Sequence, residues 1–156
     1  MSAPTLSVVE PEGDALIDHG EAHPLIPDGE YSAVYIRHEV VTLRRFGNAP
    51  KVFVWFRIVD PGAAFGVEVY RAYRVAKALG KRRFVVKRDS ELLLMLARVL
   101  QLKARPDRIT LSALKGCVLS IRVGTVTRAS NGSERPEWLR YSAVRDILRS
   151  ETGAAL

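Results

Sequence analysis

The stretch KVFVWFRIV, from Lys51 to Val59, alternates between two kinds of side chain. In an extended strand successive side chains point to opposite sides, so the two kinds lie on opposite faces. One face is apolar: Val52, Val54, Phe56 and Ile58. The other face carries two aromatic rings among cations: Lys51, Phe53, Trp55 and Arg57. Rings interleaved with cations suit the stacking of bases and the neutralisation of phosphates along one strand of nucleic acid. The alternative is that the two rings are buried under a helix or a second sheet.

Charge is distributed unevenly along the 156 residues, whose net formal charge is +7. Residues 1–30 contain seven acidic side chains and no Lys or Arg, so the rest of the chain holds all 24 basic residues against ten acidic ones. A basic body predicts a polyanionic partner, most often nucleic acid. A surface that is basic only for solubility is the alternative.

Cysteine content and hydropathy exclude several classes of protein. Cys117 is the only cysteine, so an internal disulfide and a thiolate zinc site are both excluded. We see no signal peptide, and the longest apolar run, Leu92–Ala97, is too short to span a bilayer. We therefore expect a cytoplasmic protein that has no membrane partner.

Composition divides the chain into an acidic arm over residues 1–27, a folded domain over 28–148 and a short tail over 149–156. The arm contains four prolines and little hydrophobic periodicity, so we expect it to be disordered or loosely attached. Because its charge is opposite to that of the domain, one hypothesis is that it lies across the basic face and competes with nucleic acid. The alternative is a solubilising tail.

The expected elements are three strands, a helix and two further strands. Runs of β-branched and aromatic residues predict strands over 30–43, 51–59, 67–75, 117–127 and 138–148. The last strand could give way to a short helix after Ala143. Leu, Met and Val recur at helical spacing from a helix start at Asp89 or Ser90 to a break near Pro106. The connections are a hairpin loop over 44–50, a basic segment over 76–88 that is either a short strand or a loop, a helical turn over 110–115 and a polar loop over 128–136.

Symmetric hairpin loops would pair Trp55 with Glu39 on one side and with Arg71 on the other. One face of the sheet would then hold Arg37, Phe53, Trp55, Arg57, Arg71 and Tyr73, with Tyr35 at its margin. The opposite face would be a core of Val34, Ile36, Val40, Val54, Phe56, Ile58, Tyr70 and Ala72. A slip of one residue in either register would overturn this assignment.

Three strands, a helix and two strands follow each other in the OB-fold, a five-stranded Greek-key barrel. We therefore predict a mainly β fold with one helix, a five-stranded OB-fold barrel of the order β-β-β-α-β-β. Such barrels bind oligonucleotides on the face of strands two and three and with the loops that join strands one to two and four to five. Those loops are residues 44–50 and 128–136 here. The rival is a half-open sheet covered by the helix, in the α+β class.

Several short motifs resemble the small single-stranded-DNA-binding OB-fold proteins of phages, plasmids and integrative elements. They are GEY at residues 29–31, FRIVDPG at 56–62, the apolar helix, and LKGCVLSIRV at 114–123. The resemblance covers residues 28–147. It implies a non-enzymatic homo-oligomer that coats DNA during replication, recombination or transfer of a mobile element. The chain departs from this pattern in two ways: residues 146–156 are not the acidic tail of the housekeeping bacterial proteins, and the segment 76–88 is longer and more basic.

Catalytic motifs are not evident, so we do not expect an enzyme, a cofactor or a metal site. There is no Gly-rich phosphate loop. His19 and His23 are four residues apart but lie in the acidic arm, and His38 is expected on the inner side of the first strand. Glu39 would face the nucleic-acid side, yet one carboxylate does not make a metal site.

We therefore expect a sequence-tolerant single-stranded-DNA-binding protein, with RNA as a possible substitute. Stacking would come from aromatic rings and phosphate contacts from cations. The predicted nucleic-acid-binding residues are Tyr35, Arg37, Arg44, Arg45, Lys51, Phe53, Trp55, Arg57, Arg71, Tyr73, Arg122 and Arg128. The alternative function is a protein-interaction or assembly module that uses the same aromatic face.

Overall fold

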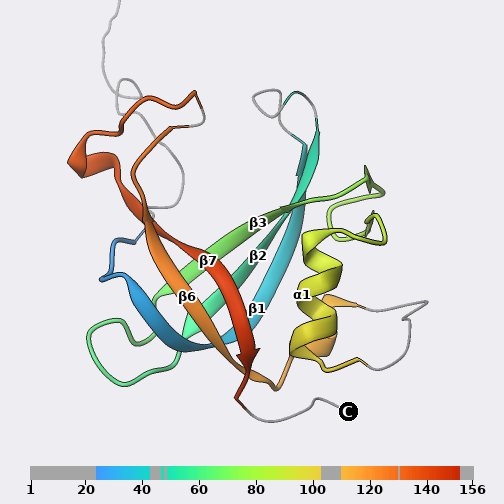
Figure 1. Ribbon diagram of the computed structural model, residues 1–156, viewed down its shortest axis with the longest axis horizontal. Helices are drawn as coiled ribbons and strands as arrows, with labels where there is room; N and C mark the ends of the chain where they lie inside the picture. Colours follow the sequence, from blue (N-terminus) through green and yellow to red (C-terminus); the bar gives the residue numbers. More distant parts are fainter. Residues whose placement is uncertain (1–23, 43–46, 48, 103–109, 130, 152–156) are drawn as a thin grey trace, which may run out of the picture.

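The structure is a computed structural model that describes residues 24–42, 47, 49–102, 110–129 and 131–151. Its centre is one five-stranded antiparallel sheet with the order β3-β2-β1-β6-β7 (Figure 1). The strands are β1 (Gly29–Thr42), β2 (Pro50–Ile58), β3 (Glu68–Arg74), β6 (Val118–Val126) and β7 (Tyr141–Ser150). One α-helix, α1 (Glu91–Val99), lies between β3 and β6 in the chain. The prediction of a mainly β chain with one helix after the third strand is confirmed.

The sheet is strongly curved, and its two edge strands, β3 and β7, approach each other. The guanidinium group of Arg71 in β3 donates hydrogen bonds to the carbonyl oxygens of Val144, at 3.4 Å, and Arg145 in β7. The hydroxyl groups of Tyr70 and Tyr141 lie 3.3 Å apart across the same gap. Within the described residues no backbone ladder joins β3 to β7. Side chains therefore hold the two edges together.

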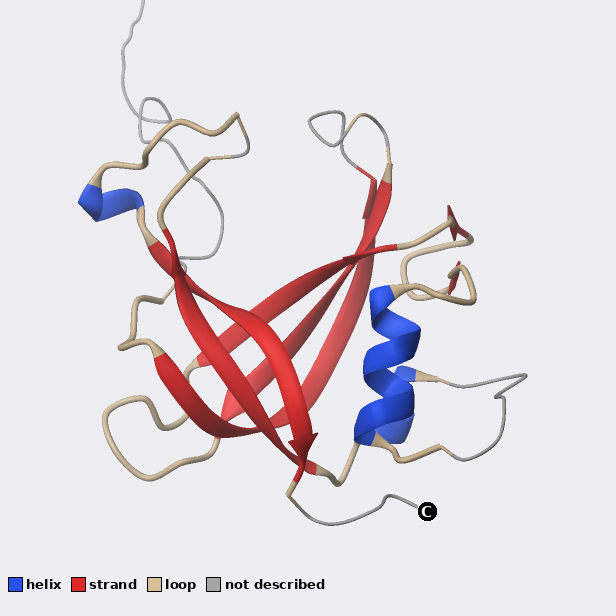
Figure 2. Cartoon of the chain, viewed as in Figure 1, coloured by secondary structure: helices blue, strands red, loops and turns tan. Residues whose placement is uncertain are grey.

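Ser90 is the N-cap of helix α1, and it is one of the two predicted caps. The Ser90 Oγ accepts a hydrogen bond from the backbone N–H of Leu93 at 3.2 Å, a cap that stabilises a helix by about 1 kcal/mol. The buried face of the helix packs into the core of the sheet: Leu92, Met95, Leu96 and Val99. Figure 2 shows the helix in blue beside one end of the curved sheet. The apolar helix is core material, as predicted.

The β2–β3 register differs by one residue from the symmetric pairing. Gly66, at a φ of +83°, donates its N–H to the carbonyl oxygen of Ile58 at 2.8 Å, while the N–H of Ile58 donates to Val67 at 2.9 Å. Gly66 and Val67 therefore both face Ile58 of β2, as in the type of β-bulge that has a glycine at its first position. A shift of one residue exchanges the faces of the following strand.

The exchange corrects the predicted face of β3. Trp55 pairs with Tyr70, and Phe53 pairs with Ala72. The side chains of Tyr70 and Ala72 thus belong to the outer face with the two rings, and their assignment to the core was wrong. Arg71 and Tyr73 lie on the opposite side of β3, so the prediction that they share the outer face was also wrong.

A bulge at Ile36 changes the faces of β1 in a similar way. It separates the pair Tyr35–Phe56 from the pair Arg37–Trp55, so the predicted pairing of Trp55 with Glu39 was wrong. Tyr35 is buried before the bulge and Val40 after it, whereas Ile36 itself is only half-buried. The prediction that Val34 and Ile36 belong to the core was therefore wrong, while the outward position of Arg37 is confirmed.

Strand β6 buries the side chains that were predicted to face inward. The inward side chains expected in β6 are buried: Leu119, Ile121 and Val123, together with Cys117 just before the strand. β7 is a continuous strand to Ser150, so the helix considered after Ala143 does not form. Trp138, expected in this strand, lies instead in the 3-10 turn η3 (Glu137–Leu139) and is 80% exposed.

Residues 24–27 pack against the start of β7. The N–H of Ser142 donates to the carbonyl oxygen of Pro24 at 2.8 Å, and the Ser142 Oγ accepts from the N–H of Ile26 at 2.8 Å. The folded domain therefore begins at or before Pro24 rather than at residue 28. The remainder of the predicted arm, with His19 and His23, lies outside the described residues.

The basic segment 76–88 forms a small hairpin of β4 (Lys77–Ala78) and β5 (Phe84–Val85). It packs on β1, since the N–H of Val40 donates to the carbonyl oxygen of Lys81 at 2.6 Å. His38 faces inward, as expected, with its Nε2 3.1 Å from the carbonyl oxygen of Arg82. The predicted helical turn is the 3-10 turn η2 (Leu111–Leu114). No helix in the described part of the chain combines the length and the apolar character that crossing a membrane requires.

Candidate nucleic-acid interface

Four partly exposed aromatic side chains form a continuous row across β2, β3 and β7. We call Phe53, Trp55, Tyr70 and Tyr141 the aromatic row. Tyr70 is its centre, with ring centroids 5.2 Å from Phe53, 5.0 Å from Trp55 and 6.3 Å from Tyr141. The rings of Phe53 and Tyr141 lie within 12° and 11° of parallel to Tyr70, while Trp55 is tilted by 39°. The spacing lies in the range of favourable aromatic pairs, so the rings hold one another in place.

Two arginines lie at the Trp55 end of the row and share one carboxylate. The guanidinium carbon of Arg37 is 4.7 Å from the centroid of the Trp55 ring, a cation–π contact. The carboxylate of Glu68 accepts hydrogen bonds from Arg37 at 3.0 Å and from Arg57 at 3.3 Å. The hydrogen bond from Arg37 is the main cause that lowers the pKa of Glu68 below its ordinary value. This carboxylate occupies the two guanidinium groups much as a phosphate would.

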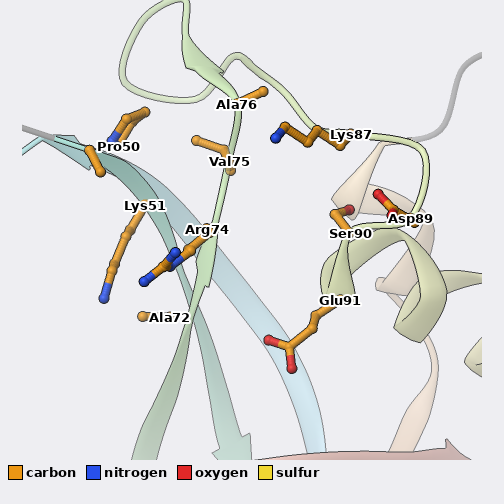
Figure 3. Close-up of a pocket in the computed structure, with 11 residues that line it drawn as sticks. Pro50, Lys51, Ala72, Arg74, Val75, Ala76, Lys87, Asp89, Ser90 and Glu91 are labelled. Carbon is orange, nitrogen blue, oxygen red and sulfur yellow. The ribbon is translucent and has the colours of Figure 1, made fainter.

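Lys51 and Arg74 form the other end of the face. They occupy opposite positions in the register of β2 and β3, so their side chains lie on the same side of the sheet. Figure 3 shows the two side chains side by side and pointing the same way, toward the small residue Ala72. A groove of about 700 Å³ continues from this point to the start of α1. Lys87 lines its far side together with Asp89 and Glu91. The face therefore passes from rings to cations along β2.

The loop between β6 and β7 holds a further arginine over the last ring of the row. The guanidinium carbon of Arg135 lies 5.3 Å from the centroid of the Tyr141 ring. The Nε of Arg135 donates to the carbonyl oxygen of Arg128 at 3.3 Å. Arg128 in turn donates to the carbonyl oxygen of Gly132 at 3.0 Å. Arg128, a predicted nucleic-acid-binding residue, thus organises the loop from which Arg135 reaches the row.

Five predicted binding residues share the outer face of the sheet: Arg37, Lys51, Phe53, Trp55 and Arg57. The face assignment of the organising strand β2 is therefore confirmed. Arg44 and Arg45 lie outside the described residues. Arg122 is exposed on β6 and pairs with Asp146 of β7, whereas Tyr141 pairs with Val126, four residues further along β6, so Arg122 does not adjoin the aromatic row.

Tyr35 and Tyr73 are buried, so their predicted place on the binding face was wrong. Tyr73 is only 3% exposed, and burial raises its pKa to about 12. Tyr35 is 8% exposed, burial also raises its pKa, and its hydroxyl lies 2.7 Å from Nδ1 of His38. The bulges at Gly66 and Ile36 are the physical reason, since each turns one tyrosine inward.

Arg71 has a structural position rather than the predicted exposed one. It bridges β3 to the backbone of β7, and its guanidinium carbon lies 5.0 Å from the centroid of the Tyr73 ring. The nearest acid is Glu91, whose carboxylate is 3.7 Å from a guanidinium nitrogen of Arg71. The side chain of Arg71 is 22% exposed. Arg71 therefore joins the sheet edges and the start of α1.

Sequence reasoning missed three members of the interface. Tyr70 was assigned to the core because the register of β3 was taken as symmetric. Tyr141 and Arg135 come from the far edge of the sheet and reach Tyr70 only because β3 and β7 meet. The Gly66 position in the loop was the one signal in the sequence that could have indicated the shift.

The described residues contain no group of three His, Cys, Asp or Glu side chains that could hold a metal ion. Cys117 is 4% exposed, inside the core.

Comparisons of this chain with models of protein families, with curated proteins and with solved structures find no match. The interface must therefore be interpreted from its own chemistry.

Proposed function

We propose that this domain is an OB-fold that binds single-stranded DNA with little preference for sequence, by stacking bases on the aromatic row. The observation that carries the proposal is the row itself, four linked rings on an outer face whose ends are cationic. A core has no need of partly exposed rings between arginines and lysines. Base stacking on such rings tolerates any sequence, because every base has a π-face.

The order of the elements supports the OB-fold part of the proposal. β1 pairs with both β2 and β6, and β7 follows β6, so the strands after the helix return to the other side of β1. The meeting of β3 with β7 would complete a barrel. The ring-bearing face then involves the second and third strands, and the loop that carries Arg135 joins the fourth strand to the fifth, the positions such folds use for oligonucleotides.

A single strand suits this surface better than a duplex. In a duplex the base faces are stacked on one another, so they do not reach side chains unless a base is unstacked at a cost of a few kcal/mol. The cations at both ends of the row can contact the backbone of the same strand. Coating of DNA in replication, recombination or transfer of a mobile element is the process that we propose for such binding.

Fluorescence anisotropy with labelled oligo-dT, duplex DNA and oligo-U tests the proposal. Phe53→Ala should weaken oligo-dT binding by roughly tenfold, because one lost stacking contact is worth about 1–3 kcal/mol. Phe65→Ala is the matched control, since Phe65 is 64% exposed in the loop at the opposite end of β2 and should have no effect. Equal losses in the two variants, or equal affinity of the wild type for duplex, would contradict the proposal.

Light scattering of the same variants distinguishes the assembly module that uses the same rings. If the row instead joined copies of the chain, Phe53→Ala would reduce the molar mass in solution and leave the affinity for oligo-dT unchanged. If the row binds DNA instead, the Phe53→Ala variant should have the same molar mass in solution as the wild-type homo-oligomer.

A further inference from the structure

The groove at the Lys51 end of the face extends beyond the aromatic row. It lies between the ends of β2 and β3 and the start of α1 (Figure 3). Lys51 and Arg74 line one side, and the amino group of Lys87 points toward Val75 from the other. No aromatic side chain lines the groove, and its apolar lining consists of proline, valine and alanines.

Acidic residues in the groove are partly compensated by a further arginine. Asp89 and Glu91 line the side nearest α1. The carboxylate of Glu91 is 3.7 Å from the guanidinium group of Arg71, which offsets its charge. Arg74 and Lys87 are both exposed and, within the described part of the chain, form no ion pair with an acidic side chain. The groove thus keeps a positive balance facing solvent.

The groove and the row are continuous along one strand. Lys51 and Phe53 project from the same face of β2, and their partners across β3 are Arg74 and Ala72. At about 3.3 Å per residue, the distance from Arg57 to Lys51 along β2 is about 20 Å. A polynucleotide stacked on the rings would reach the groove only with nucleotides beyond those that the rings hold.

We propose that this groove is a phosphate-binding subsite that grips the backbone of a single strand where it leaves the aromatic row, through Lys51, Arg74 and Lys87. The proposal rests on the proposed function of the row. The chemistry of the groove is cationic without rings, so it contacts the backbone and not the bases. Strands that cover only the rings do not use it, and longer strands do.

An oligonucleotide length series with the double variant Arg74→Ala/Lys87→Ala tests the subsite. For dT16 the Kd should rise at least about fivefold at low salt, and the slope of log K against log salt should fall by about 1.4, at about 0.7 for each lost phosphate contact. For dT4 the Kd should change less than about twofold, since a strand that covers only the rings does not contact the groove. Lys115→Ala/Arg149→Ala, which removes two exposed cations that do not line the groove, is the matched control and should leave both values unchanged.

Equal losses for dT4 and dT16, or no loss for either, would overturn the subsite while leaving stacking on the row intact. Failure of the wild type to bind any oligonucleotide would instead overturn the proposed function. Disulfide capture gives a second measurement, because Cys117, the only cysteine of the chain, is buried. Lys87→Cys should capture a dT16 that carries a pyridyl disulfide on a backbone phosphate, with release of pyridinethione, much faster than Lys115→Cys. Equal rates would contradict the subsite.

Discussion

The two ends of the outer face differ in the ion pairs that their basic side chains form. At the Trp55 end, Arg37 and Arg57 both bond to Glu68, at 3.0 and 3.3 Å. At the Lys51 end, Lys51 and Arg74 open into a groove lined by Lys87. A phosphate arriving at the first end must displace a carboxylate, whereas one that binds Arg74 and Lys87 need not, since these two form no ion pair with a described acidic side chain. The number of arginines on a face therefore does not rank their contributions to binding, because the partners that each arginine already has decide how much affinity a phosphate contact adds.

Removal of the ring between the two ends should have the largest effect. Tyr70→Ala should weaken oligo-dT binding by about tenfold to a hundredfold, since Tyr70 both offers a stacking surface and supports three other rings. Tyr70→Phe is the matched control, because it keeps the ring and removes only the hydroxyl that faces Tyr141 at 3.3 Å. Anisotropy titrations measure both, and similar affinities for the two variants would show that the ring does not stack on bases.

Release of the two arginines from Glu68 should strengthen binding. Glu68→Gln keeps the shape of the side chain but removes its charge, so Arg37 and Arg57 become available to phosphate. We expect the affinity for oligo-dT to rise about threefold to tenfold at low salt, with a steeper dependence on salt. Glu151→Gln changes an exposed acid near the end of β7 and serves as the control. Unchanged or weaker binding by Glu68→Gln would remove the distinction between the two ends.

Single arginine substitutions compare the ends directly. Arg74→Ala should lower the slope of log K against log salt by about 0.7, the value for one phosphate contact on a single strand. Arg57→Ala should lower it by less, because this arginine is already neutralised. In a Glu68→Gln background the effect of Arg57→Ala should approach that of Arg74→Ala. Equal slopes in the original background would contradict the account.

The pH dependence of stability should show the smallest effect. The pKa of Glu68 is lowered by Arg37, so the stabilisation is fully present above the unfolded value of about 4.5 and is lost as pH falls through the lower folded value. Because the carboxylate is partly exposed, we expect a modest change. Thermal unfolding from pH 7 to pH 3 should lose slightly more stability in the wild type than in Glu68→Gln. An identical fall in both proteins would show that the ion pair contributes nothing to folding.

Much of the fold follows from local patterns in the sequence. Alternation in β2 and β6 identified the inward side chains, and the periodicity of α1 identified its buried face and two candidate caps, of which Ser90 is the one that forms. The outer position of Phe53 and Trp55 was predictable for the same reason, since a strand of alternating character has only two faces.

The remainder depended on features that local patterns do not contain. A bulge at Gly66 and another at Ile36 each shift a register by one residue, which turned Tyr73 and Tyr35 inward and brought Tyr70 outward. The contribution of Tyr141 required the curvature that brings β7 to β3. Register and closure are set by loops and by the whole sheet, so neither could be obtained from one strand at a time.

The most direct test of the central claim uses the fluorescence of Trp55. The chain contains two tryptophans, and Trp138→Phe removes the more exposed one, so the remaining signal reports on the aromatic row alone. Titration of this variant with oligo-dT at low salt should quench the fluorescence of Trp55 in a saturable way, and added salt should reverse the quenching. Saturable binding of oligo-dT, seen by anisotropy, with no change in the fluorescence of Trp55 would contradict the proposal that bases stack on this row.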